Sequence, residues 1–387
     1  MREASVTISA RGVERLKSGH WWVYRSDVRA DAPAGSIVRV TDERGNFQGR
    51  AFYSDRSQIA VRLLTRQDVP IDRAFFAARL KQAAEYRGRV VDHTDAYRLV
   101  HGEADHLPSI IVDRYGDYLV IQTLSQAAEA QKALIVDLLG EQFSPAGILE
   151  RNDPKVRLLE GLEQKVGVLE GEVPDEVVAA ENGVRFVYDL AKGQKTGGFL
   201  DQRENHWAAR RYSSGEVLDC FSYQGGFALT VAGAAKHVEA IDMAPAAVNA
   251  ARRNQKLNGI ENVTFREGNT FDLLKEYDEA GRKFDTVILD PPAFAKNRDA
   301  IPAAQRGYKE INLRALKILK PGGYLITCSC SYHISEPLLL QIVAEAANDA
   351  KKSIVVAERR TQAQDHPVLL TMPETMYLKC LIVRSIE

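Results

Sequence analysis

From about residue 181 onward, the sequence alternates short apolar runs with helical patterns. The apolar runs are GEVLDCF, HVEAIDM, VTFREG, FDTVILDPP and GGYLITCSC, and helical stretches such as APAAVNAARRNQKLNG lie between them. Alternation of this kind builds a parallel sheet that is covered by helices on both faces. Ligands of such sheets bind beyond the carboxyl ends of the strands. We therefore predict an α/β Rossmann-like domain over residues 181–387, with its site where these runs end.

The first 180 residues follow two other patterns. Residues 1–70 alternate polar and apolar side chains in stretches such as SIVRVTD and SQIAVRLL, which indicates a β-rich barrel. After a change of composition at QDVPID, an amphipathic helix is expected over RAFFAARLKQAAEYRGRVV. A hairpin is expected over 109–124, turning at Tyr115-Gly116-Asp117, and a second helix over EAQKALIVDLLGEQF. Residues 71–180 are thus predicted to form a small α+β middle domain.

Composition excludes several classes of protein. There is no run of about 18 apolar residues, and the N-terminal stretch lacks the apolar core of a signal peptide. Four cysteines among 387 residues do not make a disulfide framework. We expect a soluble, cytoplasmic protein without a membrane partner.

Charge is uneven along the chain. Basic residues, 51 in all, nearly balance 52 acidic ones, but residues 1–66 hold 12 basic side chains against 7 acidic, and 11 of the 12 are arginine. The arginine fork suits phosphate oxygens. Either a nucleic-acid contact or a solvated basic face explains this excess. Trp21 and Trp22, beside these arginines, either stack on bases or form part of a core and its rim.

Polar residues stand at three successive strand ends in the predicted parallel sheet. LDCFSYQGGF is a strand followed by a glycine loop and a helix start, and it matches neither G-x-G-x-x-G nor a P-loop. Asp219 before this loop would repel a pyrophosphate but suits the amino group of S-adenosylmethionine. Asp242 could accept both ribose hydroxyls, and Asn269 could hydrogen-bond the adenine edge. Together they predict an S-adenosylmethionine site.

Asp290 ends the fourth strand, in VILDPPAFAKN. Held there, its carboxylate either caps a turn or meets a nucleobase that has left its stack. An Asp-Pro-Pro motif followed by an aromatic residue can also serve exocyclic amines. Here the aromatic residue, Phe294, stands one position late for that pattern.

Two cysteines, Cys328 and Cys330, end the next strand in LITCSCSYHIS. A zinc site needs four ligands, so no metal is expected, and a redox pair is more usually Cys-x-x-Cys. Buried packing thiols are a serious alternative for Cys328, Cys220 and Cys380. A cysteine nucleophile is the remaining reading: a thiolate that adds to carbon 6 of a pyrimidine makes carbon 5 nucleophilic enough to accept a methyl group. Asp290 could then hold the N3/N4 edge of the base.

The sequence resembles the bacterial family of large-subunit ribosomal RNA cytosine-5 methyltransferases, which carry an N-terminal PUA domain. The resemblance covers nearly the whole chain and is carried by GEADHLPSIIVDRYGDYLVIQ, GQKTGGFLDQREN, LDCFSYQGGFAL, DPPAFAKN, RGYKEINLRALKILKPGGYLITCSCS and DHPV. It implies a PUA-like RNA-binding domain over 1–70 and a class I methyltransferase domain over 181–387. It further implies 5-methylcytosine formation in 23S ribosomal RNA, with Cys330 as nucleophile and Cys328 as bystander.

The resemblance also implies cofactor contacts. Gln202 belongs to a segment that this family folds over the cofactor, and Asn269 replaces a usual aspartate, so it keeps an acceptor but loses charge. The predicted catalytic residues are Cys330 and Asp290. The predicted S-adenosylmethionine contacts are Gln202, Asp219, Phe221, Ser222, Gly225, Asp242, Met243, Asn269, Thr270 and Asp290.

The expected partner is ribosomal RNA in a single-stranded or locally opened segment, and a homodimer is considered. Two other functions stay open. One is an amine-directed RNA methyltransferase, and the other is a non-catalytic RNA-binding ribosome assembly factor.

Overall fold

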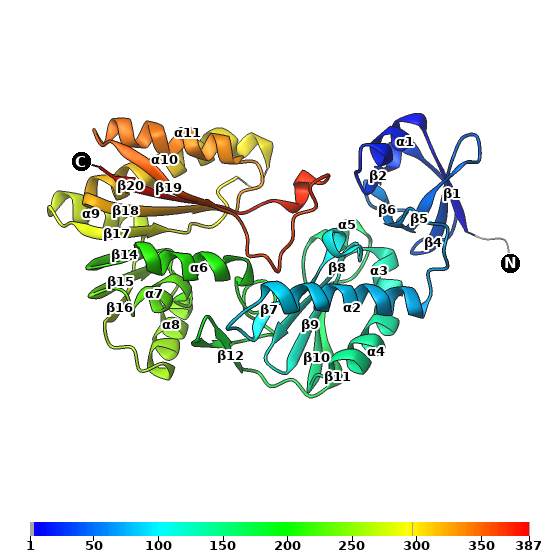
Figure 1. Cartoon of the computed structure of the whole chain (residues 1–387), viewed down its shortest axis with the longest axis horizontal. Helices are drawn as coiled ribbons and strands as arrows, with labels where there is room; N and C mark the ends of the chain where they lie inside the picture. Colours follow the sequence, from blue (N-terminus) through cyan, green and yellow to red (C-terminus); the bar gives the residue numbers. More distant parts are fainter. Residues whose placement is uncertain (1–3, 296, 387) are drawn as a thin grey trace. The chain divides into compact units, whose positions relative to one another are not determined.

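The structure, a computed structural model, describes residues 4–295 and 297–386, and its backbone divides into two compact units (Figure 1). The first unit comprises Met1–Ala179, Tyr188–Leu200 and Gln364–Thr375, and the second comprises Ala180–Val187, Asp201–Ala363 and Met376–Glu387. In the described part of the chain, no helix has the length and apolarity needed to cross a membrane.

A six-stranded sheet forms the N-terminal part of the first unit, as the alternating pattern predicts. Its strand order is β2-β6-β5-β4-β1-β3, and Val38 and Val40 of β4 point into a core from which solvent is excluded. The elements are β1 (Ser5–Ile8), α1 (Ala10–Lys17), β2 (Trp22–Tyr24), β3 (Val28–Asp31), β4 (Ile37–Asp42), β5 (Phe47–Tyr53) and β6 (Ile59–Thr65).

Two arginines in this part of the chain are structural. Arg62 is 5% exposed and pairs with Glu160 at 2.7 Å. Arg66 donates to the carbonyl of Leu16 at 2.7 Å. The arginine excess of the first 66 residues is therefore only partly a free basic face.

The two tryptophans are half-buried, which agrees with a core and its rim. The Trp21 ring lies 4.1 Å from that of His106, and Trp22 Nε1 donates to Glu103 at 3.0 Å.

A five-stranded sheet of order β11-β10-β9-β8-β7 follows in the same unit. The predicted hairpin is confirmed, because Tyr115 pairs with Tyr118 across Gly116-Asp117. The predicted second helix is broken at Gln131 into two helices. The elements are α2 (Arg73–Val90), β7 (Ala96–His101), β8 (Ile110–Tyr115), β9 (Tyr118–Thr123), α3 (Gln126–Ala130), α4 (Lys132–Phe143), β10 (Gly147–Asn152), α5 (Val156–Leu159) and β11 (Lys165–Gly171).

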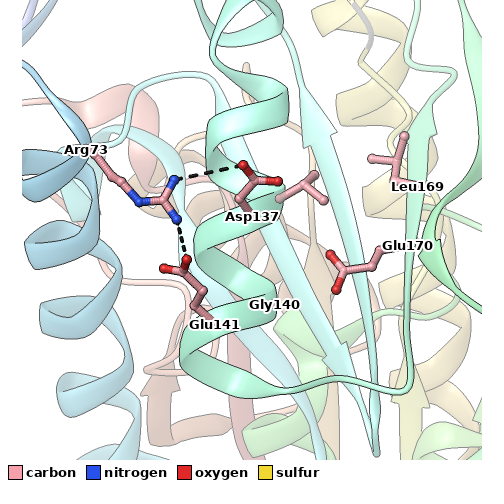
Figure 2. A pocket seen from close by; sticks show the side chains of 7 residues that line it. Arg73, Asp137, Gly140, Glu141, Leu169 and Glu170 are labelled. Carbon is pink, nitrogen blue, oxygen red and sulfur yellow. Dashed lines mark hydrogen bonds and ion pairs between the residues drawn. The ribbon is translucent and has the colours of Figure 1, made fainter.

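A hollow in this unit lies against α4 and β11 (Figure 2). Arg73 reaches Glu141 at 2.5 Å and Asp137 at 3.9 Å, as Figure 2 shows. Glu170 lies over Gly140, where an added Cβ would meet its carboxylate at 2.8 Å. Because the arginine in the hollow is already neutralised by carboxylates, we assign no ligand to it.

The second unit is built on a seven-stranded sheet of order β16-β15-β14-β17-β18-β20-β19. Helices α9, α10 and α11 share one hydrophobic core with the sheet, and α7 and α8 lie on its other side (Figure 1). The prediction of an α/β domain is confirmed. The elements are β14 (Glu216–Cys220), α7 (Gly226–Val231), β15 (His237–Asp242), α8 (Pro245–Leu257), β16 (Val263–Glu267), α9 (Thr270–Glu279), β17 (Phe284–Leu289), α10 (Ile301–Ile318), β18 (Leu319–Ser329), α11 (Glu336–Asp349), β19 (Ile354–Arg360) and β20 (Lys379–Ser385).

The sheet is not wholly parallel, which corrects the expectation from the alternation. Strand β20 pairs antiparallel with both β18 and β19. A short hairpin, β12 (Val177–Glu181) and β13 (Val184–Tyr188), and the helix α6 (Arg203–Ala209) precede the sheet. Insertion of β20 brings the last strand of the chain against the strand that precedes Cys330.

Candidate cofactor and catalytic site

The glycine loop after β14 has an unusual backbone. Phe221, Tyr223 and Gly225 have φ angles of 65°, 47° and 91°. Left-handed conformations cost non-glycine residues energy and tend to occur at functional sites. The loop is held by its neighbours, since Ser222 N donates to the carbonyl of Ile241 at 2.9 Å. The chain thus makes a tight turn at the carboxyl end of β14, and α7 begins directly after this turn.

Gly226 begins α7 where no larger residue fits. An added Cβ would lie 2.5 Å from the ring of His206, whose Nδ1 is bonded to Glu181 at 2.5 Å. The His206 ring also packs on Phe227, with centroids 4.4 Å apart. The second glycine of the motif is therefore required by a close approach of α6 to the loop.

We expect Gly226→Ala to destabilise the protein by about 1–3 kcal/mol, because the methyl group overpacks the His206 contact. Urea unfolding measures the change. The matched control is Gly88→Ala in α2, where an added Cβ meets nothing within 4 Å. That variant should be stabilised by up to about 1 kcal/mol. Equal stability of Gly226→Ala and the unsubstituted protein would contradict the packing argument.

Asp219 is a buried carboxyl group of which one oxygen accepts a hydrogen bond. It is 0% exposed, and its Oδ2 accepts from Ala228 N at 3.0 Å. Its Oδ1 has no hydrogen-bond partner among the described residues. Burial, and then the charge of Asp290, raise the pKa of Asp219 well above its usual range. A buried acceptor without a donor is costly, so the site fits a cationic ligand group such as an ammonium.

Asp242 ends β15 and holds the loop. Its Oδ2 accepts from Tyr223 N at 2.8 Å and its Oδ1 from Ala244 N at 2.9 Å. Both oxygens keep a lone pair for a further donor, such as a sugar hydroxyl.

The remaining residues predicted to contact a cofactor differ in exposure. Asn269 is exposed and caps α9, and its Oδ1 accepts from Phe271 N at 2.9 Å. The acceptor that was expected to face adenine therefore also caps the helix, and its second lone pair is left for a further donor. Met243 is 71% exposed, whereas Thr270 and Ser222 are buried, and Phe221 packs against the core.

Asp290 is oriented by a chain of side chains. Gln202 Nε2 donates to Asp290 Oδ1 at 2.8 Å, and Asn205 Nδ2 donates to Gln202 Oε1 at 2.7 Å. Arg360 Nε donates in turn to Asn205 Oδ1 at 2.9 Å. Gln202 and Asn205 are buried, so the guanidinium of Arg360 fixes which way both amides point. Gln202 is thus brought to the predicted catalytic carboxylate.

Cys330 lies directly after β18, which ends at Ser329. The serines on either side of it share one partner. Ser329 Oγ donates to Tyr308 Oη at 2.9 Å, and Ser331 Oγ lies 3.1 Å from the same oxygen. Tyr308 is fully buried in α10, and burial raises its pKa. The Ser-Cys-Ser segment is therefore clamped, and the sequence reasoning missed the tyrosine although it lies in the quoted stretch RGYKEINL.

The four cysteines differ in environment. Cys220, Cys328 and Cys380 are buried, whereas Cys330 is half-exposed. Burial raises the pKa of Cys220, and a hydrogen bond with Cys380 together with burial raises that of Cys328. Within the described ranges, no cluster of three potential metal ligands occurs. Of the four thiols, that of Cys330 is the one a ligand can reach.

Comparison with known proteins identifies the family of this chain. Residues 162–384 match the model of the S-adenosylmethionine-dependent methyltransferase family, and residues 6–66 match a PUA-like domain. The chain is 41% identical over 391 residues to ribosomal RNA large subunit methyltransferase I of Erwinia tasmaniensis, covering 98% of this chain and 99% of the relative. This chain belongs to the ribosomal RNA large subunit methyltransferase I family. Its Vibrio cholerae relative is 42% identical over 376 residues, with 94% and 95% covered.

Solved structures agree with the family in fold. A Streptococcus mutans chain described as a SAM-dependent methyltransferase has a TM-score of 0.82 at 20% identity, covering 98% of this chain and 99% of its own. SMU.776, described as a methyltransferase and solved with SAH, has a TM-score of 0.83 at 21% identity with the same coverage. As a member of an S-adenosylmethionine-dependent family, the chain uses S-adenosylmethionine as its cofactor. The unpartnered Asp219 oxygen and the glycine loop fit that cofactor.

Proposed function

We propose that this protein methylates carbon 5 of a cytosine in 23S ribosomal RNA through a covalent adduct with Cys330. The observation that carries the proposal is the state of the cysteines: Cys330 is half-exposed and clamped at a strand end, and the other three are buried. The relatives' names support large-subunit ribosomal RNA as the substrate. We further propose the division into 1–70, 71–180 and 181–387.

The cofactor would be held at the carboxyl ends of β14, β15 and β16. Asp219 would accept from its ammonium group and Asp242 from its ribose hydroxyls, and Asn269 would lie toward its adenine. Gln202, Phe221, Ser222, Gly225, Met243 and Thr270 would complete the contacts. When bound, S-adenosylmethionine supplies an electrophilic methyl group.

The chain's own residues would activate the base. The thiolate of Cys330 would add to carbon 6 of the cytosine, which places electron density on carbon 5. Asp290, held by Gln202, would bind the N3/N4 edge and stabilise the adduct. After carbon 5 has been methylated and has lost its proton, the bond between sulfur and carbon 6 would break and return the free thiolate.

The amine-directed alternative is less well supported. It would need an aromatic side chain beside Asp290 to stack on the target base. Phe294 instead packs on Tyr308, with ring centroids 4.8 Å apart, and against the core of the second unit. An opened RNA segment as substrate follows from the same chemistry, because carbon 6 must be reached from one face. A homodimer stays a prediction that light scattering can check.

The direct test uses ribosomal RNA from cells that lack this gene. It is incubated with the protein and radiolabelled S-adenosylmethionine, digested to nucleosides and separated. We expect the label in 5-methylcytidine. Label in a nucleoside methylated on an exocyclic amine would overturn the thiol mechanism. RNA binding without any labelled nucleoside would support the non-catalytic alternative instead.

A further inference from the structure

We propose that Lys379 is a positioning residue whose ammonium group holds Cys330 as the nucleophilic thiolate. The inference deepens the proposed function, because it names the group that prepares the thiol for attack. It concerns a residue outside every motif that predicts the site.

Lys379 occupies a place where lysine is rarely found. It begins β20 within the apolar run YLKCLIV, lies directly opposite Ser329 of β18, and is 6% exposed. Buried ammonium groups are costly unless they are paired. A methionine or leucine would fill this position without that cost, so the charge calls for a partner.

Its hydrogen bonds aim the ammonium at the Ser-Cys-Ser segment. Lys379 Nζ donates to the carbonyl of Ser331 at 2.7 Å and to that of Tyr377 at 2.8 Å. An ammonium has three donors, so two neutral acceptors leave it one more. Among the residues that the structure describes, no carboxylate lies within ion-pair distance of Lys379. Lys379 thus donates its hydrogen bonds to backbone carbonyls, one of them beside Cys330, and not to a carboxylate.

Cys330 is the ionisable group that acts on this lysine. Burial lowers the pKa of Lys379 to about 8, and the charge of Cys330 acts in the opposite direction. A lysine with that pKa is mostly protonated at pH 7. Two other titratable groups beside this segment are Tyr308 from α10 and Asp290 after β17. Burial first, and then negative charge on Cys330 and Asp290, raises the pKa of Tyr308.

This balance assigns the lysine its role. Asp290 opposes a second negative charge nearby, and Tyr308 is held neutral, so neither favours a thiolate. A free cysteine with an ordinary pKa of about 8.5 is only a few per cent ionised at neutral pH. The buried ammonium of Lys379, which is hydrogen-bonded to the residue after Cys330, is the group that favours ionisation of the thiol.

The test measures thiol ionisation without RNA. Cys330 is alkylated with iodoacetamide between pH 5 and 10, and the rate is read from the modified peptide by mass spectrometry. Lys379→Gln keeps donors for both carbonyls but removes the charge. We expect the alkylation midpoint to rise by about one pH unit, so that the rate at pH 7 falls about tenfold. An unchanged midpoint in this variant would overturn the proposal.

Two further measurements keep the result interpretable. Urea unfolding and S-adenosylmethionine binding show whether Lys379→Gln is folded. If the variant is not folded, the unsubstituted protein still decides. Its alkylation rate at Cys330 should reach half of its maximum at a pH below about 8.5, the ordinary thiol pKa, and a midpoint at or above that value would overturn the proposal. Lys379→Arg, which keeps the charge, should restore a midpoint nearer to that of the unsubstituted protein.

The outcome separates this proposal from the function on which it rests. If Cys330→Ala still methylates RNA, the covalent mechanism fails, whereas a shifted midpoint in Lys379→Gln would stand. If Cys330→Ala is inactive and the midpoint does not move, only the role of Lys379 fails. In the methyl-transfer assay, Lys379→Gln should lose about tenfold in kcat at pH 7 and recover part of it at pH 9, where Cys330 ionises without help.

Discussion

Cys330→Ala is expected to lower methyl transfer by about 10⁴-fold or more, while the Kd for S-adenosylmethionine changes less than twofold. The large loss follows because removal of a covalent nucleophile removes the route through the adduct altogether. The small change in Kd follows because Asp219 and the glycine loop, which are proposed to hold the cofactor, belong to other strand ends. Transfer of labelled methyl groups to RNA and calorimetric titration with the cofactor measure the two quantities.

Cys328→Ala is the matched control. Cys328 lies two residues earlier, but it is buried and hydrogen-bonded to Cys380. Its loss should cost stability of about 1 kcal/mol and leave the rate within about threefold. Activity retained in Cys330→Ala and lost in Cys328→Ala would reverse the assignment of nucleophile and bystander.

Asp219→Asn is expected to weaken S-adenosylmethionine binding by about 10- to 100-fold. A hydrogen bond from an ammonium to a carboxylate contributes about 1.5–3 kcal/mol, and each 1.4 kcal/mol is tenfold in Kd. The amide keeps an oxygen for Ala228 N but offers the ammonium no charge. Calorimetric titration gives the Kd, and Asp272→Asn, which neutralises an exposed carboxylate of α9, is the control for net charge.

The same carboxyl predicts opposite effects of pH on binding and on stability. Burial raises the pKa of Asp219 in the folded protein well above its usual range. The folded state therefore holds a proton that the unfolded chain releases above about pH 4, and stability falls as pH rises from there toward the folded pKa. Cofactor affinity should rise over the same window, because the ionised form is the one that binds an ammonium.

Asp219→Asn should flatten both dependences. Without cofactor, the variant should be at least as stable as the unsubstituted protein near pH 8. It should nevertheless bind S-adenosylmethionine more weakly. Urea unfolding at pH 5 and pH 8, without cofactor, measures this. A cofactor Kd that does not change in the variant would rule out Asp219 as the ammonium partner.

The local elements of this protein could be predicted from its sequence. Period-two alternation produced the strands of the N-terminal sheet, and the hairpin turns at Gly116-Asp117 as expected. Strand and helix alternation indicated the α/β domain, because side-chain periodicity and turn residues act over a few positions. Asp219, Asp242 and Asp290 could be proposed for the same reason: each lies at or directly after the carboxyl end of a parallel strand.

The tertiary structure alone decided which side chains surround these residues. Some of the arginines that suggested a basic face are buried in ion pairs, since Arg62 pairs with Glu160, which lies 98 residues later in the chain. Tyr308 reaches the serines beside Cys330 from a helix 21 and 23 residues earlier in the chain. Lys379 arrives on a strand that runs antiparallel to its neighbours. Spacing along a chain carries no information about such contacts, because strand order and burial are settled only when the whole sheet packs.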